Sequence, residues 1–134
     1  MKKNGILNAR LSYIIASMGH TDRLVICDSG LPIAKKTNVV DLALVENIPT
    51  FIDTLRSVLK ELKVERAIIA GEMEKVNNKI FKQVVQVMDD IPLDKVPHEK
   101  FKELTNGTGN ISFVRTGEAT PFANIILISG VIFD

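Results

Sequence analysis

Short apolar runs alternate with segments of helical periodicity along this chain of 134 residues, and this alternation restricts its fold more than any other feature. Runs with the length and composition of strands are predicted at 24–27, 39–45, 66–70, 93–96, 111–114 and 124–132, of which 93–96 is the weakest. Apolar residues three to four apart predict helices over 11–18, 51–62, 78–88 and 98–104. Asn8 and Thr50 are placed to cap the first two of these helices.

Strands that alternate with helices of this length are typical of an α/β protein. We therefore expect a three-layer α/β/α sandwich with a largely parallel central sheet and Rossmann-like topology. The chain is long enough to bury a core and short for two ordinary domains, so we expect a single domain over residues 1–134. It contains neither the Gly-x-Gly-x-x-Gly run nor the Walker loop of nucleotide-binding versions of such a fold.

Charge and composition narrow the classes of partner. The net charge of +1 provides no overall attraction for nucleic acid or anionic lipid, so we expect a small or neutral ligand and neither a nucleic-acid nor a membrane partner. Cys27 is the single cysteine, which excludes an intrachain disulfide and a thiolate zinc cluster. The first residues lack a secretory signal and no run approaches the ~20 apolar residues that span a bilayer, so we expect a cytoplasmic protein.

Two groups that can move protons flank the predicted strand 24–27. His20 lies just before it and Asp28 just after it, at a carboxyl end where ligands gather in sheets of this kind. The residues alone leave ordinary structural roles open for both. His20 is also placed as a cation at a helix C-terminus, and Asp28 as a turn former that binds local amides.

Three separated motifs carry a resemblance to a known family. They are Gly-His-Thr-Asp at 19–22, Asp-Ser-Gly-Leu-Pro at 28–32, and Arg-Thr-Gly-Glu at 115–118 leading into Thr-Pro-Phe-Ala-Asn-Ile-Ile-Leu at 120–127. In this order, and over nearly the whole chain, they resemble the ribose pyranase and fucose mutarotase family. The resemblance implies an isomerase of ribose catabolism that interconverts β-D-ribopyranose and β-D-ribofuranose without a cofactor or metal. It also implies a homodecamer of two stacked five-membered rings, with sites near subunit boundaries.

The resemblance also implies roles for individual residues. His20 corresponds to the family's proton donor, and Asp28 to a sugar-binding residue that is expected to orient His20. The other implied sugar-binding residues are His98, Phe122, Ala123 and Asn124, and Lys102 is similar to a lysine that reaches a neighbouring subunit's site. By itself, His98 is an unremarkable surface histidine at the start of a helix. Glu118, also close to Phe122 in sequence, is by default a solvated loop residue.

One departure from the family leaves alternatives open. The family usually has tyrosine where this chain has Phe122, so a phenolic hydrogen bond of roughly 0.5–1.5 kcal/mol is lost. This departure affects the sugar preference more than the reaction type, and a fucose-type mutarotase is the near alternative. A non-catalytic sugar-binding or regulatory subunit is another, although aromatic side chains for stacking sugars are few. A flavodoxin-like signalling domain fits the alternating pattern but has no acidic cluster or phosphate loop.

Overall fold

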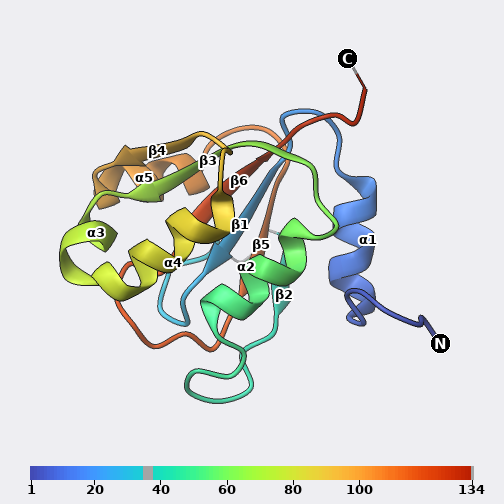
Figure 1. Ribbon diagram of the computed structural model, residues 1–134, viewed down its shortest axis with the longest axis horizontal. Coiled ribbons are helices and arrows are strands. Elements are labelled where there is room, and N and C mark those ends of the chain that lie inside the picture. Colours follow the sequence, from blue (N-terminus) through green and yellow to red (C-terminus); the bar gives the residue numbers. More distant parts are fainter. Residues whose placement is uncertain (35–37, 134) are drawn as a thin grey trace.

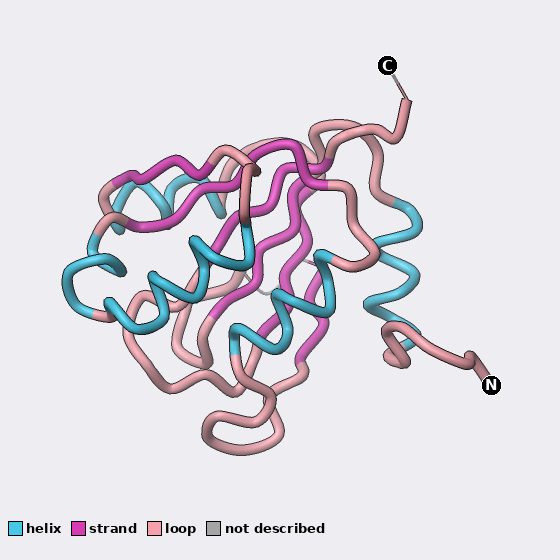
Figure 2. Tube along the Cα trace, in the orientation of Figure 1, coloured by secondary structure: helices cyan, strands magenta, loops and turns pink. Residues whose placement is uncertain are grey.

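The computed structural model describes residues 1–34 and 38–133 (Figures 1 and 2). The elements are, in chain order, α1 (Ala9–Ser17), β1 (Arg23–Cys27), β2 (Asn38–Asp41), α2 (Phe51–Leu59), β3 (Val64–Ala70), α3 (Glu72–Val76), α4 (Asn78–Met88), β4 (Leu93–Val96), α5 (His98–Thr105), β5 (Ile111–Arg115) and β6 (Ile125–Ser129). Every predicted strand and helix has a counterpart among them. Within the described residues, no helix is both long and apolar enough to cross a membrane.

The strands form one mixed sheet in the order β2-β5-β1-β6-β3-β4. β6 runs antiparallel to its neighbours β1 and β3, and the other neighbouring pairs are parallel. The expectation of a largely parallel sheet is therefore confirmed. Because β1 and β6 lie in the middle and are covered on both faces, they read as continuous apolar runs, as strands buried on two sides do.

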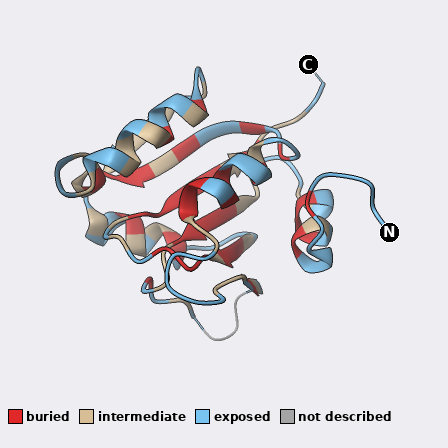
Figure 3. Cartoon of the chain, turned by 60° about the horizontal axis from the view of Figure 1, so that its bottom comes forward, coloured by how far each residue is buried: buried red, intermediate tan, exposed pale blue. Residues whose placement is uncertain are grey.

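Helices cover both faces of the sheet, as expected for a three-layer sandwich. α2 and α4 lie on the face that is in front in Figure 1, and α1 packs at the side of the same core. α5 covers the opposite face together with the loop that follows β1. Side chains alternate along a strand. Leu24 and Ile26 therefore pack into the core on the face that α2 and α4 cover, and Val25 and Cys27 pack into the core on the face that α5 covers. Figure 3 shows the buried residues concentrated in the central strands between these layers.

The predicted caps are confirmed. The side-chain oxygen of Asn8 accepts a hydrogen bond from the Leu11 N–H at 2.9 Å, and Thr50 Oγ1 accepts one from the Asp53 N–H at 3.1 Å. Each cap satisfies a backbone donor that a helix leaves free at its first turn.

The structure shortens two predicted strands and adds a helix. The run 39–45 is a strand only over Asn38–Asp41, after which a hairpin turn joins Val45 to Ile48 and ends the pairing with β5. The run 124–132 is a strand only over Ile125–Ser129, where it reaches the ends of both neighbouring strands. The five-residue helix α3 was not predicted because it is too short to display a helical period.

Candidate functional site

Three predicted site residues gather at the carboxyl edge of the parallel strands. Asp28 follows β1 directly, and His98 follows β4 after one intervening residue. Asn124 precedes β6, and because β6 is antiparallel to β1, its beginning lies at the same edge as the end of β1. Topology therefore brings together side chains that are up to 96 positions apart in the sequence.

Asn124 and Asp28 are joined directly. The Asn124 Oδ1 accepts a hydrogen bond from the Asp28 N–H at 2.9 Å, and the Asn124 side chain is almost completely buried. One Asp28 oxygen, Oδ1, accepts from the Gly30 N–H at 2.9 Å, which is the turn-forming contact that its sequence position also predicts. The turn role and a ligand-binding role are compatible, because a carboxylate has several acceptor positions.

His98 is held by its backbone and by its ring. Its N–H donates to both carboxylate oxygens of Glu72, at 3.1 and 3.0 Å, which caps a helix whose preceding residue, Pro97, forms no side-chain cap. Its imidazole stacks on Phe101 at a centroid distance of 6.4 Å and meets the edge of Phe122 at 5.0 Å. Glu72 belongs to the helix that was not predicted, so no signal in the sequence connected it to His98.

Two buried polar atoms in this cluster have no hydrogen-bond partner within the described residues: His98 Nδ1 and Asn124 Nδ2. Buried polar side-chain atoms are normally paired, and an unpaired one needs an explanation. An amide nitrogen donates, an imidazole nitrogen donates or accepts according to its tautomer, and a carboxylate accepts. The cluster is thus suited to a ligand with several hydroxyl groups.

Burial raises the pKa of the Asp28 carboxyl above its usual value. The hydrogen bond from the Gly30 N–H, the nearby Asn124 amide and a positive charge on His98 oppose this rise without cancelling it. A carboxyl group whose pKa is raised towards neutrality is better suited to exchanging protons than an ordinary surface carboxylate is.

Phe122 and Ala123 contribute in different ways. Phe122 adopts a left-handed backbone with φ of 58° and presents its ring to His98. Ala123 is fully buried and packs its side chain into the core. Ala123 therefore can offer a ligand only its backbone.

His20 lies at the other end of β1. The five-residue strand separates the two edges of the sheet by about 16 Å. Figure 1 shows the loop before β1 at the top, beside the C-terminal segment, and the loop after β1 at the bottom. The His20 Nε2 lies 2.9 Å from Glu65 Oε2, and its side chain is 53% exposed. Within one chain, then, Glu65 rather than Asp28 orients His20.

Lys102 lies on α5, one helical turn after His98. Its Nζ pairs with Glu99 Oε1 at 2.9 Å, a contact between positions three apart on one helix. The Lys102 side chain is about one third exposed. Within the described residues, Lys102 forms no hydrogen bond or ion pair with Asp28 or Asn124.

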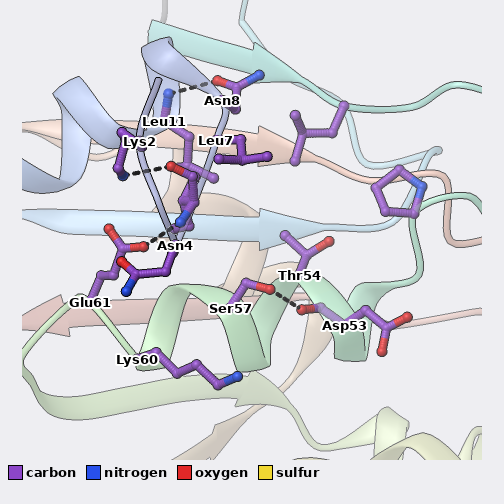
Figure 4. A pocket seen from close by; sticks show the side chains of 14 residues that line it. Lys2, Asn4, Leu7, Asn8, Leu11, Asp53, Thr54, Ser57, Lys60 and Glu61 are labelled. Carbon is purple, nitrogen blue, oxygen red and sulfur yellow. Dashed lines mark hydrogen bonds between the residues drawn. The ribbon is translucent and has the colours of Figure 1, made fainter.

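A cavity of about 700 Å³ lies elsewhere, between the N-terminal segment and α2 (Figure 4). None of the predicted site residues lines it. Several of its polar groups are already paired: Lys2 Nζ donates to the Ile6 carbonyl at 2.7 Å, and Glu61 accepts from the Ile6 N–H at 2.6 Å. The cluster at the carboxyl edge, with its two unpaired atoms, is therefore the better candidate site.

Cys27, next to Asp28, allows a first prediction. Burial, with a smaller contribution from the Asp28 charge, raises the pKa of its thiol to about 12. At pH 8 roughly one thiol in 10,000 is then ionised, so we expect the folded protein to resist iodoacetamide for hours and the denatured protein to react completely. Mass spectrometry of both samples checks this. Rapid labelling of the folded protein would contradict the described packing of Cys27.

Fold and candidate site together define a class: an α/β protein with a cluster of polar side chains, two of whose buried atoms are unpaired, at the carboxyl edge of a mostly parallel sheet. The chain belongs to the RbsD / FucU transport protein family, whose sequence profile matches residues 1–132. The resemblance carried by the three sequence motifs is thereby confirmed.

Known proteins of this family match the chain over its length. A D-ribose pyranase of Petrotoga mobilis is 52% identical over 133 residues, covering 99% of this chain and all of that protein. The structure of Bacillus subtilis RbsD complexed with D-ribose is 41% identical, with a TM-score of 0.92 over 99% of this chain and all of that one. A fucose mutarotase of Streptococcus pneumoniae in complex with L-fucose, 22% identical with a TM-score of 0.79 over 95% of each chain, shares the fold.

Proposed function

We propose that this protein is a D-ribose pyranase, an isomerase that interconverts β-D-ribopyranose and β-D-ribofuranose and supplies the furanose to a ribose kinase. The observation that carries the proposal is the cluster of Asp28, His98 and Asn124, whose two unpaired buried atoms match the hydrogen-bonding capacity of sugar hydroxyls. Relatives that carry this name over their full length support it. We also propose that residues 1–134 act as one domain, in the cytoplasm, where a sugar kinase has its ATP.

The reaction requires only proton transfers. A base removes the proton of the anomeric hydroxyl, the bond between C1 and the ring oxygen breaks, and an acid protonates the ring oxygen. The hydroxyl on C4 then adds to the free aldehyde, loses its proton, and the former carbonyl oxygen gains one. Atoms and electrons balance within the sugar and two proton-transfer groups, so no cofactor is needed.

Each residue of the cluster has a different proposed contact with the sugar. Asn124 Nδ2 is available to donate to a hydroxyl oxygen, and Asp28 accepts from hydroxyl groups and exchanges a proton. His98 Nδ1 provides a third polar contact, and the ring of Phe122 covers an apolar face of the sugar. Ala123 contacts the sugar through its backbone.

His20 is proposed as the proton donor, and its position requires a second copy of the chain. It lies about 16 Å from the Asp28 end of β1, too far to reach a sugar bound there within one chain. We therefore propose that His20 of one copy completes the site formed by Asp28, His98 and Asn124 of another. Such a contact joins the edge of one copy that carries His20 to the edge of the next copy that carries Asp28. Repeated contacts between two different surfaces close into a ring when the rotation between neighbouring copies is a whole fraction of a turn, as in a homodecamer of two five-membered rings.

Exposed apolar side chains at both edges support contacts between copies. The turn after β2 carries Leu44, Val45 and Ile48 at the carboxyl edge. Ile132 and Phe133, which are 92% and 72% exposed, follow β6 at the edge where His20 lies. Groups of exposed apolar residues mark interaction surfaces. We also propose that Lys102 extends from α5 to a neighbouring site.

The test is saturation-transfer proton NMR on D-ribose, reading exchange between the pyranose and furanose anomeric signals with and without the protein. Faster exchange supports the proposal. Binding of ribose without faster exchange would instead indicate a sugar-binding or regulatory subunit. Light scattering of the same sample measures the oligomeric state, and a monomer with full activity would exclude the shared site.

A fucose-type mutarotase is the second candidate, because Phe122 lacks the phenolic hydroxyl group with which the family's usual tyrosine would bind the sugar. We expect Phe122→Tyr to lower KM for D-ribose about two- to tenfold through the restored hydrogen bond. Phe122→Leu, which removes the aromatic ring without adding a hydroxyl group, is the control and is expected to raise KM. Exchange rates are measured for D-ribose and L-fucose in parallel. A wild-type protein that accelerates only fucose exchange would favour the second candidate.

A further inference from the structure

The segment between β5 and β6 is held by a chain of side-chain hydrogen bonds. Thr120 Oγ1 donates to Glu118 Oε2 at 2.7 Å, and Asn77 Nδ2 donates to Thr120 Oγ1 at 2.9 Å and to the Pro121 carbonyl at 2.8 Å. We call these contacts the Glu118–Thr120–Asn77 relay. Glu118 is 4% exposed, so the expectation of a solvated loop residue was wrong.

Burial of the Glu118 carboxylate is costly. Within residues 1–34 and 38–133 no cation pairs with it, and its charge is compensated by hydrogen bonds alone. Its Oε1 accepts from the Phe51 N–H at 2.9 Å, at the start of α2, where a negative charge is favourable. Its Oε2 contacts Thr120. One oxygen thus stabilises a helix, while the other connects to the segment that leads to the candidate site.

The relay ends next to a strained residue. Phe122 has a φ of 58°, a left-handed conformation that is unfavourable for a bulky side chain and persists only when its surroundings impose it. On the C-terminal side of Phe122, the Asn124 N–H donates to the Phe122 carbonyl at 2.9 Å, and the Asn124 side chain is hydrogen-bonded to the Asp28 N–H. Phe122 is therefore held from both sides, and its ring meets the His98 imidazole edge-on at 5.0 Å.

We propose that Glu118, acting through Thr120, is a positioning residue that keeps Phe122 in its left-handed conformation against His98 and so shapes the sugar site. The proposal rests on the proposed function for its effect on catalysis, but its structural effect is measurable without any sugar. Asn77 supports the same segment from the junction between α3 and α4. None of the three side chains touches the sugar; they act through the backbone of residues 120–122.

The experiment compares Thr120→Val with Thr120→Ser. Valine has nearly the shape of threonine but cannot donate to Glu118, whereas serine keeps the hydroxyl. We expect Thr120→Val to raise KM for D-ribose about tenfold with a smaller change in kcat, and Thr120→Ser to stay within about twofold of the wild type. Asn77→Ala, at a half-buried position, is a second variant that loosens the same segment and is expected to act in the same direction.

The second readout is the proton NMR signals of the histidine rings. The chain has two histidines, so a His20→Ala spectrum assigns both sets. We expect the His98 signals to shift in Thr120→Val because the Phe122 ring moves, and the His20 signals, at the other edge, to stay in place. Unchanged His98 signals and unchanged KM in Thr120→Val, or equal effects of valine and serine, would overturn the proposal. If the wild type proves inactive, the proposed function fails, but the His98 shift still decides whether the relay positions Phe122.

Discussion

Replacing His20 by alanine is expected to slow pyranose–furanose exchange of D-ribose by about 10²- to 10⁴-fold, the usual contribution of a positioned proton donor. Histidine is a common general acid and base in enzymes. The His20 side chain is exposed, so a sugar held by a neighbouring copy can reach it, and it is oriented by Glu65 at 2.9 Å. Saturation-transfer NMR on the variant and the wild type measures the loss.

Two controls separate this role from a general loss of structure. In the proposed shared site, Asp28, His98 and Asn124 of another copy hold the sugar, so His20→Ala is expected to bind D-ribose with an affinity close to that of the wild type. Glu65→Gln keeps a polar partner for the imidazole but removes the charge, and is expected to cost only about tenfold. Full exchange activity in His20→Ala would refute the assignment of the proton donor.

Two inactive variants are expected to restore activity when their chains share an oligomer. Asp28→Asn removes the proton-exchanging carboxylate, and each single variant is expected to lose at least about 99% of the exchange rate. In randomly mixed oligomers, a site that takes His20 from one copy and Asp28 from the next is complete in about one case in four. Coexpression of the two chains, followed by the exchange assay, measures the recovery.

The matched control is a double variant that carries His20→Ala and Asp28→Asn in one chain and is mixed with the wild type. If sites are shared, random mixing of equal amounts leaves about one quarter of all sites complete. When the wild type and the double variant form separate oligomers, about half of all sites are complete. If each site lies within one chain, mixing changes nothing, and the two single variants stay inactive together. Recovery in the first mixture and loss in the second are therefore expected as a pair.

Local patterns in the sequence were sufficient for most of the fold. The caps at Asn8 and Thr50, the central strand after His20 and the helix that begins at His98 depend on neighbours a few positions away, and each lies where it was predicted. The three motifs identified the family as well, because they are read directly from the chain.

The contacts between distant residues depend on the folded chain. Local spacing is enough to place His20 and Asp28 at the two ends of a strand, but the sheet order, with β6 antiparallel beside β1, is what places Asn124 against Asp28. Only the tertiary structure brought Glu65, on β3, to His20 and buried Glu118. Spacing along a chain specifies local geometry, whereas strand order and loop packing minimise the free energy of the whole molecule, so contacts between distant residues appear only in the folded structure.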